Sequence, residues 1–551
     1  MKRAWWKEAV GYQIYPKSFQ DVNGDGIGDI QGIIERLDYL EDLGIDFIWV
    51  CPMYKSPKDD NGYDISDYKD ILAEFGTMDD FDALLQEVHR RGMKLIIDLV
   101  LNHTSDEHPW FIESRSSKDN PKRDWYIWRD SKDNKEPNNW ESIFGGSAWE
   151  FDKETEQYYL HIFSKKQPDL NWENPEVREA LYETVNWWLE KGIDGFRIDA
   201  ISHIKKRPHL PDLPNTENKK YVSSFDMHMN QEGIHSFLQE FKEQTYSNYD
   251  VITVGEANGV SADEADLWVG ENGKMDMIFQ FEHLDLWDHE AEQQLDIPGL
   301  KKALTRWQKG LEEDGWNALF IENHDKARSV STWGNDKEYW SKSAKALGTM
   351  YFFMQGTPFI YQGQEIGMTN YHFPSIEHYD DVAAKNAYHN MIEEGFSQAE
   401  AMKVLWNTSR DNSRTPMQWN DEAYAGFTTG TPWLSINPNH KTINVEAQEK
   451  DENSILSYYK RMIQTRKTND LLVYGSYDLL MIEDDQVYAY TRTLGEEQAY
   501  IITNLTDRDA TFLSPVPLDS AHLVLSNDNI DLHEGQKELR LAPFEARVYI
   551  L

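Results

Sequence analysis

The sequence predicts an α/β protein whose centre is a barrel of parallel strands, and three observations indicate this fold. Short apolar runs alternate with amphipathic helical patterns over most of the 551 residues, as parallel strands joined by crossover helices require. The runs are apolar almost throughout, which is typical of a parallel sheet that is covered by helices. They number eight, and this is the number that closes a (β/α)8 TIM barrel.

The predicted strands occupy the first two thirds of the chain. In residues 94–100 only Asp98 interrupts the apolar side chains, so both faces of this strand are expected to be buried. Strands that are each followed by a helix imply a closed barrel, because crossovers between parallel strands are nearly always right-handed. The strands are expected at 10–15, 45–50, 94–100, 195–199, 251–256, 275–281, 318–322 and 358–362.

Start and stop signals mark the helices between the strands. Asn174 is a suitable N-cap with Pro175 in the first helical position, and Gly192 is placed to end the same helix. Thr77 is likewise expected to cap a helix that Gly92 ends. These signals divide the barrel sequence into regular strand and helix units.

Three segments depart from this alternation and divide the chain into parts. Residues 104–170 are polar, irregular and rich in tryptophan, which indicates a loop-rich domain inserted after the third strand. Residues 369–452 indicate a second loop insertion. The barrel is therefore expected in two parts, 1–103 and 171–471, and the alternating pattern of 472–551 predicts a C-terminal antiparallel β-sandwich.

The composition limits the partners that the protein can have. The formal net charge is −41, so phosphate backbones and anionic membranes are repelled, and we expect no nucleic-acid or membrane partner. Cys51 is the single cysteine, which excludes an intramolecular disulfide. The sequence shows no signal-peptide pattern and no membrane-spanning run, so we expect a cytoplasmic monomer or weak homo-oligomer. Aromatic residues make up 13% of the chain and suit a small ligand such as a sugar.

A carboxylate and a guanidinium stand together on the fourth predicted strand. Arg197 and Asp199 are two residues apart, so in an extended strand both side chains point to the same face. The arginine is expected to keep the aspartate ionised, as a nucleophile at the carboxyl end of a barrel strand requires. An isolated pair of this kind can instead be a structural ion pair.

Other strand ends carry polar residues too, which argues against an isolated structural pair. Buried carboxylates are rare unless they are paired or functional, and barrel active sites are assembled at the carboxyl ends of the strands. The sequence therefore predicts one polar site that four strand ends share. Its residues are Asp98, His103, Arg197, Asp199, Glu256, His324 and Asp325.

The loop after the first strand has the pattern of a cation site. Side-chain oxygens stand at alternate positions between Asp21 and Asp29, with glycines among them, as hard cations such as Ca²⁺ prefer. Gly32 occupies the position of the closing glutamate in such loops, so Asp29 would close the site. Asx turns that cap the loop's own backbone would give the same pattern, and Mg²⁺ accepts the same ligand types. The predicted ligands of a structural Ca²⁺ are Asp21, Asn23, Asp25, Ile27 and Asp29.

Six segments resemble motifs of a known enzyme family. The residues at the strand ends are similar to the four signature regions of the α-amylase family of glycoside hydrolases, in the same order and on the same strands. Two further segments, Gln167–Asn171 and Arg414–Trp419, resemble the oligo-1,6-glucosidase and bacterial α-glucosidase branch of that family. The four signature regions correspond to Asp98–His103, Gly195–Ser202, Val254–Ala257 and Glu322–Asp325.

The resemblance implies a retaining glycoside hydrolase with a covalent intermediate. Such an enzyme needs two carboxyl groups about 5–5.5 Å apart. Asp199 would be the nucleophile, and Glu256 would be the general acid and then the general base. Nearby anions are expected to raise the pKa of Glu256. Asp325 matches the family's third carboxylate, which binds ring hydroxyls and favours the distorted transition state.

The resemblance also implies how the terminal glucose is held. Asp60 and Arg410 would close the pocket behind this sugar, as in relatives that release one glucose at a time. Arg414 lies close enough in the sequence to compete for the role of Arg410. The other implied contacts are His103 and His324 with the sugar ring, Tyr63 and Phe163 as stacking surfaces, and Asp98 with Arg197. Each histidine has the alternative of a packing role in the core.

Ala200, directly after the implied nucleophile, indicates the preferred linkage. Members of the branch that prefer α-1,6 bonds typically have valine at the matching position, whereas alanine leaves space for a 4-linked sugar. We therefore expect an exo-acting α-glucosidase that releases glucose from maltose and maltotriose. The balance between hydrolysis and glucosyl transfer is left open.

Four alternatives share some of these features. An oligo-1,6-glucosidase and a trehalose-6-phosphate hydrolase have the same motifs, and the latter would need a basic phosphate grip at the entrance. Sucrose isomerases carry an arginine-rich loop after the fourth region, where this chain has Lys326-Ala327-Arg328. A catalytically dead binding homologue would lack one or more of the carboxylates, whereas this chain keeps all three.

Overall fold

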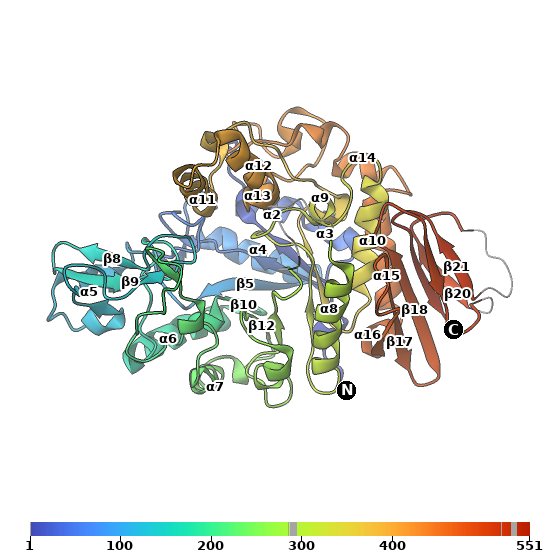
Figure 1. The fold of residues 1–551 in the computed structure, drawn as a ribbon. Coiled ribbons are helices and arrows are strands. Elements are labelled where there is room, and N and C mark those ends of the chain that lie inside the picture. The colour runs from blue at the N-terminus through green and yellow to red at the C-terminus, as the bar shows by residue number, and fades with distance from the viewer. Residues whose placement is uncertain (1, 285, 287–294, 519–520, 531–536) are drawn as a thin grey trace.

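A nearly closed barrel of eight parallel strands forms the centre of the protein (Figure 1). The strands follow the order β13-β12-β10-β5-β2-β1-β15-β14, and β13 and β14 lie side by side where the sheet closes. All eight coincide in place with the predicted strands. They are β1 (Gly11–Ile14), β2 (Phe47–Val50), β5 (Lys94–Val100), β10 (Gly195–Asp199), β12 (Ile252–Glu256), β13 (Met277–Phe279), β14 (Ala318–Leu319) and β15 (Thr357–Tyr361). The computed structural model describes residues 2–284, 286, 295–518, 521–530 and 537–551.

The strand β14 is shorter than the predicted strand at 318–322. It pairs with β15 only at Ala318 and Leu319. The next carbonyl, that of Phe320, lies 2.9 Å from the imidazole Nε2 of His283 and is bonded there instead of to a neighbouring strand. The chain therefore leaves the sheet early, before it reaches the fourth signature region.

The barrel helices begin and end at the residues that the sequence marks. Asn174 caps α6 (Pro175–Lys191) with its side chain, and Gly192 ends this helix with a φ of 96°. Thr77 starts α4 (Met78–Arg90) with a capping box. No helix in the described part of the chain has the length and the apolar character of a bilayer span. The other described barrel helices are α1 (Trp5–Glu8), α2 (Ile30–Glu35), α3 (Leu37–Leu43), α7 (Ile234–Gln244), α8 (Ile297–Leu311), α9 (Ser329–Thr332) and α10 (Trp340–Phe352).

The insertion after β5 forms a small domain at the left of Figure 1. It contains α5 (Pro109–Ser116) and a three-stranded antiparallel sheet in the order β6-β9-β8. Its β7 pairs with β11, which belongs to the loop after β10, so this loop contacts the inserted domain. The strands are β6 (Trp128–Arg129), β7 (Trp140–Glu141), β8 (Trp149–Asp152), β9 (Gln157–Leu160) and β11 (Val222–Ser223).

The segment 369–452 contains a helical hairpin, where we expected a loop insertion. Its helices α11 (Val382–Glu393) and α12 (Gln398–Thr408) share a core that includes Phe373 and Tyr379. Much of their remaining surface is polar and exposed, so the apolar pattern that would have marked them is weak. The short helices α13 (Asp411–Arg414) and α14 (Val445–Glu449) follow.

The C-terminal segment forms two antiparallel layers, as predicted for a β-sandwich. A five-stranded sheet in the order β16-β17-β18-β22-β20 and the pair β19-β21 enclose apolar side chains that include Tyr500, Phe512 and Leu541. The larger sheet also packs on α10 and on α15 (Ile455–Lys467), which α16 (Asp470–Tyr474) follows. The strands are β16 (Ser476–Leu480), β17 (Val487–Leu494), β18 (Glu497–Asn504), β19 (Ala510–Leu513), β20 (His522–Ser526), β21 (Glu538–Leu541) and β22 (Ala546–Ile550).

Candidate active site

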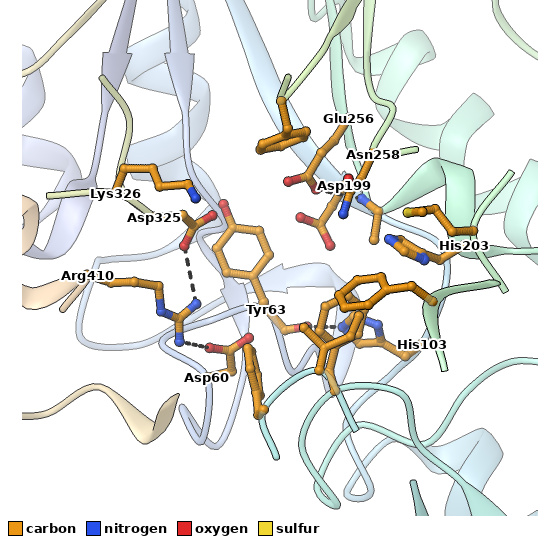
Figure 2. Close-up of a pocket in the computed structure, with 17 residues that line it drawn as sticks. Asp60, Tyr63, His103, Asp199, His203, Glu256, Asn258, Asp325, Lys326 and Arg410 are labelled. Carbon is orange, nitrogen blue, oxygen red and sulfur yellow. Dashed lines mark hydrogen bonds and ion pairs between the residues drawn. The ribbon is translucent and has the colours of Figure 1, made fainter. Parts of the chain in front are cut away.

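The carboxyl ends of the barrel strands surround a cavity of about 600 Å³ (Figure 2). Cavities of about 300–1,000 Å³ are typical of small-molecule sites. Most of the predicted site residues meet here, although Arg197 and His324 are buried behind the cavity wall. The predicted residues that line it are Asp60, Tyr63, His103, Phe163, Asp199, Ala200, Glu256, Asp325 and Arg410.

Arg197 joins three carboxylates beneath the cavity. Its Nη1 donates to Asp98 Oδ1 at 2.9 Å and to Asp199 Oδ1 at 2.7 Å. Its Nη2 lies 3.1 Å from Glu256 Oε2. Asp199 and Glu256 end the neighbouring strands β10 and β12. The planar guanidinium therefore holds both carboxylates at the same end of the barrel, and both point into the same space (Figure 2).

The pKa of Asp199 is raised well above its ordinary value. Burial is the largest cause, the negative charge of Glu256 adds to it, and the positive charge of Arg197 opposes it. We expected Arg197 to keep Asp199 ionised, but the same guanidinium also serves Asp98 and Glu256. That Glu256 carries the proton for the leaving group stays a prediction.

Ala200 turns the chain sharply after the end of β10. Its φ of 45° and ψ of 30° lie in the left-handed region, which is uncommon for residues with a side chain and least suited to β-branched ones. In this conformation the N–H of Ala200 donates to Glu256 Oε2 at 2.8 Å. The residue that follows Asp199 thus helps to position the second carboxylate.

Asp325 is the third carboxylate of the cavity, and two arginines and a histidine contact it. Arg410 Nη1 donates to its Oδ1 at 3.2 Å and Arg414 Nη2 at 2.9 Å, while His324 Nε2 lies 3.2 Å from Oδ2. Burial alone would raise the pKa of Asp325, but the interactions with His324 and the two arginines lower it well below its ordinary value. Asp325 is therefore ionised at neutral pH and accepts hydrogen bonds only. Of the two arginines, Arg410 lines the cavity and Arg414 is buried behind it.

Asp60 and Arg410 meet at one end of the cavity, as the resemblance implied. Arg410 Nη2 donates to Asp60 Oδ1 at 3.1 Å. Asp60 lies in the turn between β3 (Tyr54–Lys55) and β4 (Asp67–Ile71). Asp381, which sequence reasoning missed, accepts two further bonds from the same guanidinium, at 3.0 and 2.6 Å. Arg410 thus links Asp60, Asp325 and Asp381 at that part of the cavity.

Tyr63 and the two predicted histidines lie close together. The Tyr63 hydroxyl donates to Asp98 Oδ2 at 2.9 Å and lies 2.7 Å from His324 Nε2, with the two rings stacked. Gln13 Nε2 lies 2.7 Å from His324 Nδ1, so both imidazole nitrogens have partners within the protein. A direct bond from His324 to a sugar stays a prediction. His103 lines the cavity, and burial lowers its pKa to about 4, so it is neutral at pH 7.

Aromatic side chains from the inserted domain narrow the cavity. The Phe163 ring lies 5.2 Å from His103 and 5.6 Å from Phe144, measured between ring centroids. Phe144 also lies under the guanidinium of Arg410, 5.0 Å from its ring centroid. Asn386 of α11 donates to the carbonyl of Phe144 at 3.1 Å. The inserted domain and the helical hairpin therefore meet beside the cavity.

Sequence reasoning missed eight residues that line the cavity. Three of them follow predicted strand ends, which was a usable signal: Asn258 stands two residues after Glu256, Phe281 ends a predicted strand, and Lys326 follows Asp325. The other five lie in loops whose sequence has no regular pattern. They are Ile143, Phe144, His203, Phe225 and Met229.

The loop of the predicted cation site, residues 21–29, is organised by its own backbone. Asp21 accepts the N–H groups of Gly24 and Gly26, each at 2.8 Å, and Asp29 caps α2. This is the Asx-turn pattern, although Oδ1 of Asp21 and Oδ1 of Asp29 each accept one hydrogen bond and keep a second lone pair that a cation could use. Among the residues that the structure describes, no three His, Cys, Asp or Glu side chains are grouped as a metal site requires. The bound Ca²⁺ stays a prediction.

Known proteins resemble this chain over its whole length. Residues 13–475 match the family model described as alpha amylase, catalytic domain. The probable oligo-1,6-glucosidase 3 of Bacillus subtilis (strain 168) is 59% identical over 552 residues, which cover 100% of both chains. Two solved structures cover 100% of this chain and 100% of their own, each at 45% identity: trehalose-6-phosphate hydrolase of Bacillus licheniformis, with a TM-score of 0.93, and isomaltulose synthase of Klebsiella sp. LX3, with 0.95. Since the family model spans most of the chain and these relatives cover all of it, the chain belongs to the α-amylase family and is a glycoside hydrolase.

Proposed function

We propose that the protein is a retaining, exo-acting α-glucosidase that releases glucose from the non-reducing end of short gluco-oligosaccharides. The observation that carries this proposal is a pair of carboxylates, Asp199 and Glu256, on one guanidinium in a cavity that the ion pair of Asp60 and Arg410 also lines. We infer that this ion pair closes one end of the cavity, which admits a terminal sugar and leaves no room for a chain that continues beyond it. Each reaction then releases one glucose.

The proposed reaction has two displacement steps. An oxygen of Asp199 attacks the anomeric carbon and forms a glucosyl ester, while the bond to the leaving oxygen breaks and Glu256 gives that oxygen its proton. Glu256 then takes a proton from water, whose oxygen attacks the same carbon and releases Asp199. Two inversions retain the α configuration. The ionised Asp325 accepts hydrogen bonds from ring hydroxyls throughout.

We propose α-1,4 bonds as the preferred linkage, with maltose and maltotriose as substrates. Ala200 lines the cavity beside Asp199, and its small side chain leaves space for a 4-linked second sugar. An α-1,6 preference is the second candidate, because the Bacillus subtilis relative is named a probable oligo-1,6-glucosidase. The name of the Bacillus licheniformis relative adds trehalose 6-phosphate to the substrates worth testing.

A comparison of substrates and products tests this proposal. The protein is assayed on maltose, maltotriose, maltotetraose, isomaltose, sucrose and trehalose 6-phosphate. Proton NMR follows the configuration of the glucose released from maltotriose, whose leaving group is maltose. We expect kcat/KM for maltose to exceed that for isomaltose, and α-glucose to appear before β-glucose. Early β-glucose would contradict the two-step mechanism, and maltose as the first product of maltotetraose would contradict exo action. A higher kcat/KM for isomaltose would overturn the linkage preference alone.

A further inference from the structure

Lys326 brings a positive charge to the cavity that the proposed reaction does not use (Figure 2). The arginines of the site already have partners within the protein, because Arg197 and Arg410 each contact three carboxylates. The ammonium of Lys326, in contrast, forms no hydrogen bond or ion pair with any residue that the structure describes. A cation without a partner in an active-site cavity is available to a ligand.

The order of the strands places Lys326 on the side of the leaving group. The strands β14, β13 and β12 are neighbours, and the segments after them bring Lys326, Phe281 and Asn258 to the cavity. A general acid must lie beside the leaving oxygen, so the residues around Glu256 face the group that leaves. Asp60 comes from the segment after β2, on the other side of the barrel.

The surroundings of Lys326 agree with this placement. His283 follows Phe281 by two residues, and its pKa is lowered to about 4, mainly by burial and in part by the positive charge of Lys326. Lys326 therefore lies near the end of β13. Phe281, Phe225 and Met229 line the same cavity with apolar side chains. Charges interact more strongly beside such side chains than in bulk water.

We propose that Lys326 is a specificity-determining residue for the leaving group, and that it favours α-glucosides whose leaving sugar carries an anion, either a carboxylate or a phosphate. The inference rests on the proposed function, since it concerns the sugar that hydrolysis releases. A neutral leaving sugar offers the ammonium only hydroxyl oxygens, whereas an anion forms a charge-assisted hydrogen bond, which is shorter and stronger.

Lys326 could instead act only on Asp325, through its positive charge, and this role would change the kinetic constants differently from binding of the leaving group. Lys326 is adjacent to Asp325 in sequence, and through its charge alone it would change kcat by the same factor for charged and neutral substrates. Binding of the leaving group changes kcat/KM for the anionic substrates much more than for the neutral ones, mainly through KM. Substrates that are matched except for charge separate the two roles.

Two substrate pairs differ in the charge of the leaving group and in little else: maltobionate with maltitol, and trehalose 6-phosphate with trehalose. kcat/KM is measured for all four with the wild-type protein, Lys326→Gln and Lys326→Arg. We expect Lys326→Gln to lower the anionic-to-neutral ratio by about tenfold in at least one pair, and Lys326→Arg to retain most of it. Lys118→Gln, an exposed residue of the inserted domain, is the matched control and should keep the wild-type ratio.

Salt gives a second readout for the same variants. Sodium chloride at about 0.5 M screens charge interactions. It weakens the repulsion of anionic substrates by the net charge of −41 equally in both proteins, so the ratio of the wild-type protein should fall relative to that of Lys326→Gln. The pair that responds identifies the anion as a carboxylate or a phosphate. Unchanged ratios in both pairs, or an equal loss on all four substrates, would overturn the inference. A wild-type protein that hydrolyses none of these glucosides, nor maltose, would refute the proposed function instead.

Discussion

At the scale of single residues, the site depends on one arginine that contacts several carboxyl groups at once. Arg197 contacts Asp98, Asp199 and Glu256 at 2.9, 2.7 and 3.1 Å. If all three carboxyls were ionised, a buried space would hold more negative than positive charge, which is unfavourable. A single proton on the pair of Asp199 and Glu256 reduces this excess. The buried arginine therefore influences the charge of this pair of carboxyls as well as its geometry.

Glu256→Gln tests whether the negative charge of Glu256 raises the pKa of Asp199. The variant removes a negative charge that raises the pKa of Asp199, so the pKa of Asp199 should fall. Because the proposed nucleophile, Asp199, can attack only when ionised, the acid limb of the kcat/KM profile should move to lower pH. The profile is measured with an aryl glucoside whose leaving group needs no general acid. On maltose, which does need one, kcat should fall by about 10²–10⁴-fold.

The control for this experiment is Glu190→Gln, an exposed carboxylate at the end of α6. It removes the same charge far from the pair and should keep the wild-type acid limb. An acid limb of Glu256→Gln that stays in place or moves to higher pH would show that Glu256 does not act on Asp199 through its charge.

Ala200→Val should move the preference from maltose toward isomaltose. The larger side chain fills the space beside Asp199, and a change of this size in a pocket is worth about 10–200-fold in discrimination. Valine is also strained at a φ of 45°, so a loss of stability of about 1–3 kcal/mol should accompany the change. The measurement is the isomaltose-to-maltose ratio of kcat/KM, with Ala200→Gly as the variant that relieves strain without adding volume. An unchanged ratio in Ala200→Val would remove Ala200 from the account of linkage.

The sequence was sufficient to predict the carboxylates at the strand ends, but less so to predict the residues that surround them. Asp199 and Glu256 could be found because each interrupts or ends an apolar run whose place in a barrel is known. Asp381 could not, because a polar residue in a polar segment gives no signal of its own, and Lys326 was missed although it directly follows Asp325. Asp381 contacts Arg410 and Lys326 lines the cavity, and both arrangements exist only in the folded chain.

At the scale of elements, the strands could be predicted better than the insertions. A barrel strand is buried on both faces, so its whole pattern is local and visible. The hairpin of α11 and α12 depends on a core that extends from Phe373 to Leu434, which no short window contains. The pairing of β7 with β11 similarly joins Trp140 to Val222. Such contacts depend on how distant segments meet, and local periodicity does not record them.

The loop 21–29 is the element whose predicted ligand can be tested directly. The N–H of Asp21 donates to the carbonyl of Phe427 at 2.9 Å, and a Cβ on Gly26 would lie only 1.8 Å from the carbonyl oxygen of Thr431. A cation in this loop would therefore stabilise two distant parts of the chain. At about 100 times its Kd, Ca²⁺ would add about 2.7 kcal/mol of stability. We expect EDTA to lower the melting temperature and added Ca²⁺ to restore it.

Two aspartates separate this effect from general charge effects. Asp25 is exposed, and its side chain accepts the N–H of Ile27 at 2.9 Å, so Asp25→Ala should abolish the response to Ca²⁺ at little other cost. Asp266→Ala, also exposed, should keep the response. A melting temperature that EDTA and Ca²⁺ leave unchanged would mean that the loop is held by its Asx turns alone.

At the scale of the whole molecule, the excess of acidic residues dominates the long-range electrostatics. The chain has 96 Asp and Glu against 55 Lys and Arg, and some of the cations are held in ion pairs such as Arg91 with Asp38 and Lys206 with Asp169. The remaining negative charges repel one another, which favours solubility and disfavours the compact state. A neutral sugar does not respond to this field, so surface charge and activity can be separated by experiment.

Higher ionic strength should therefore stabilise the protein without changing its activity on maltose. The Debye length falls from about 30 Å at 0.01 M salt to about 10 Å at 0.1 M, so repulsion between distant surface charges weakens. In EDTA, the melting temperature should rise by roughly 2–4 °C, while kcat/KM for maltose stays constant. Sodium chloride and tetramethylammonium chloride should act alike, because screening depends on ion concentration and valence. A rise with sodium alone would indicate a specific ion site, and a fall with both salts would mean that attractive ion pairs outweigh the repulsion that the net charge of −41 implies.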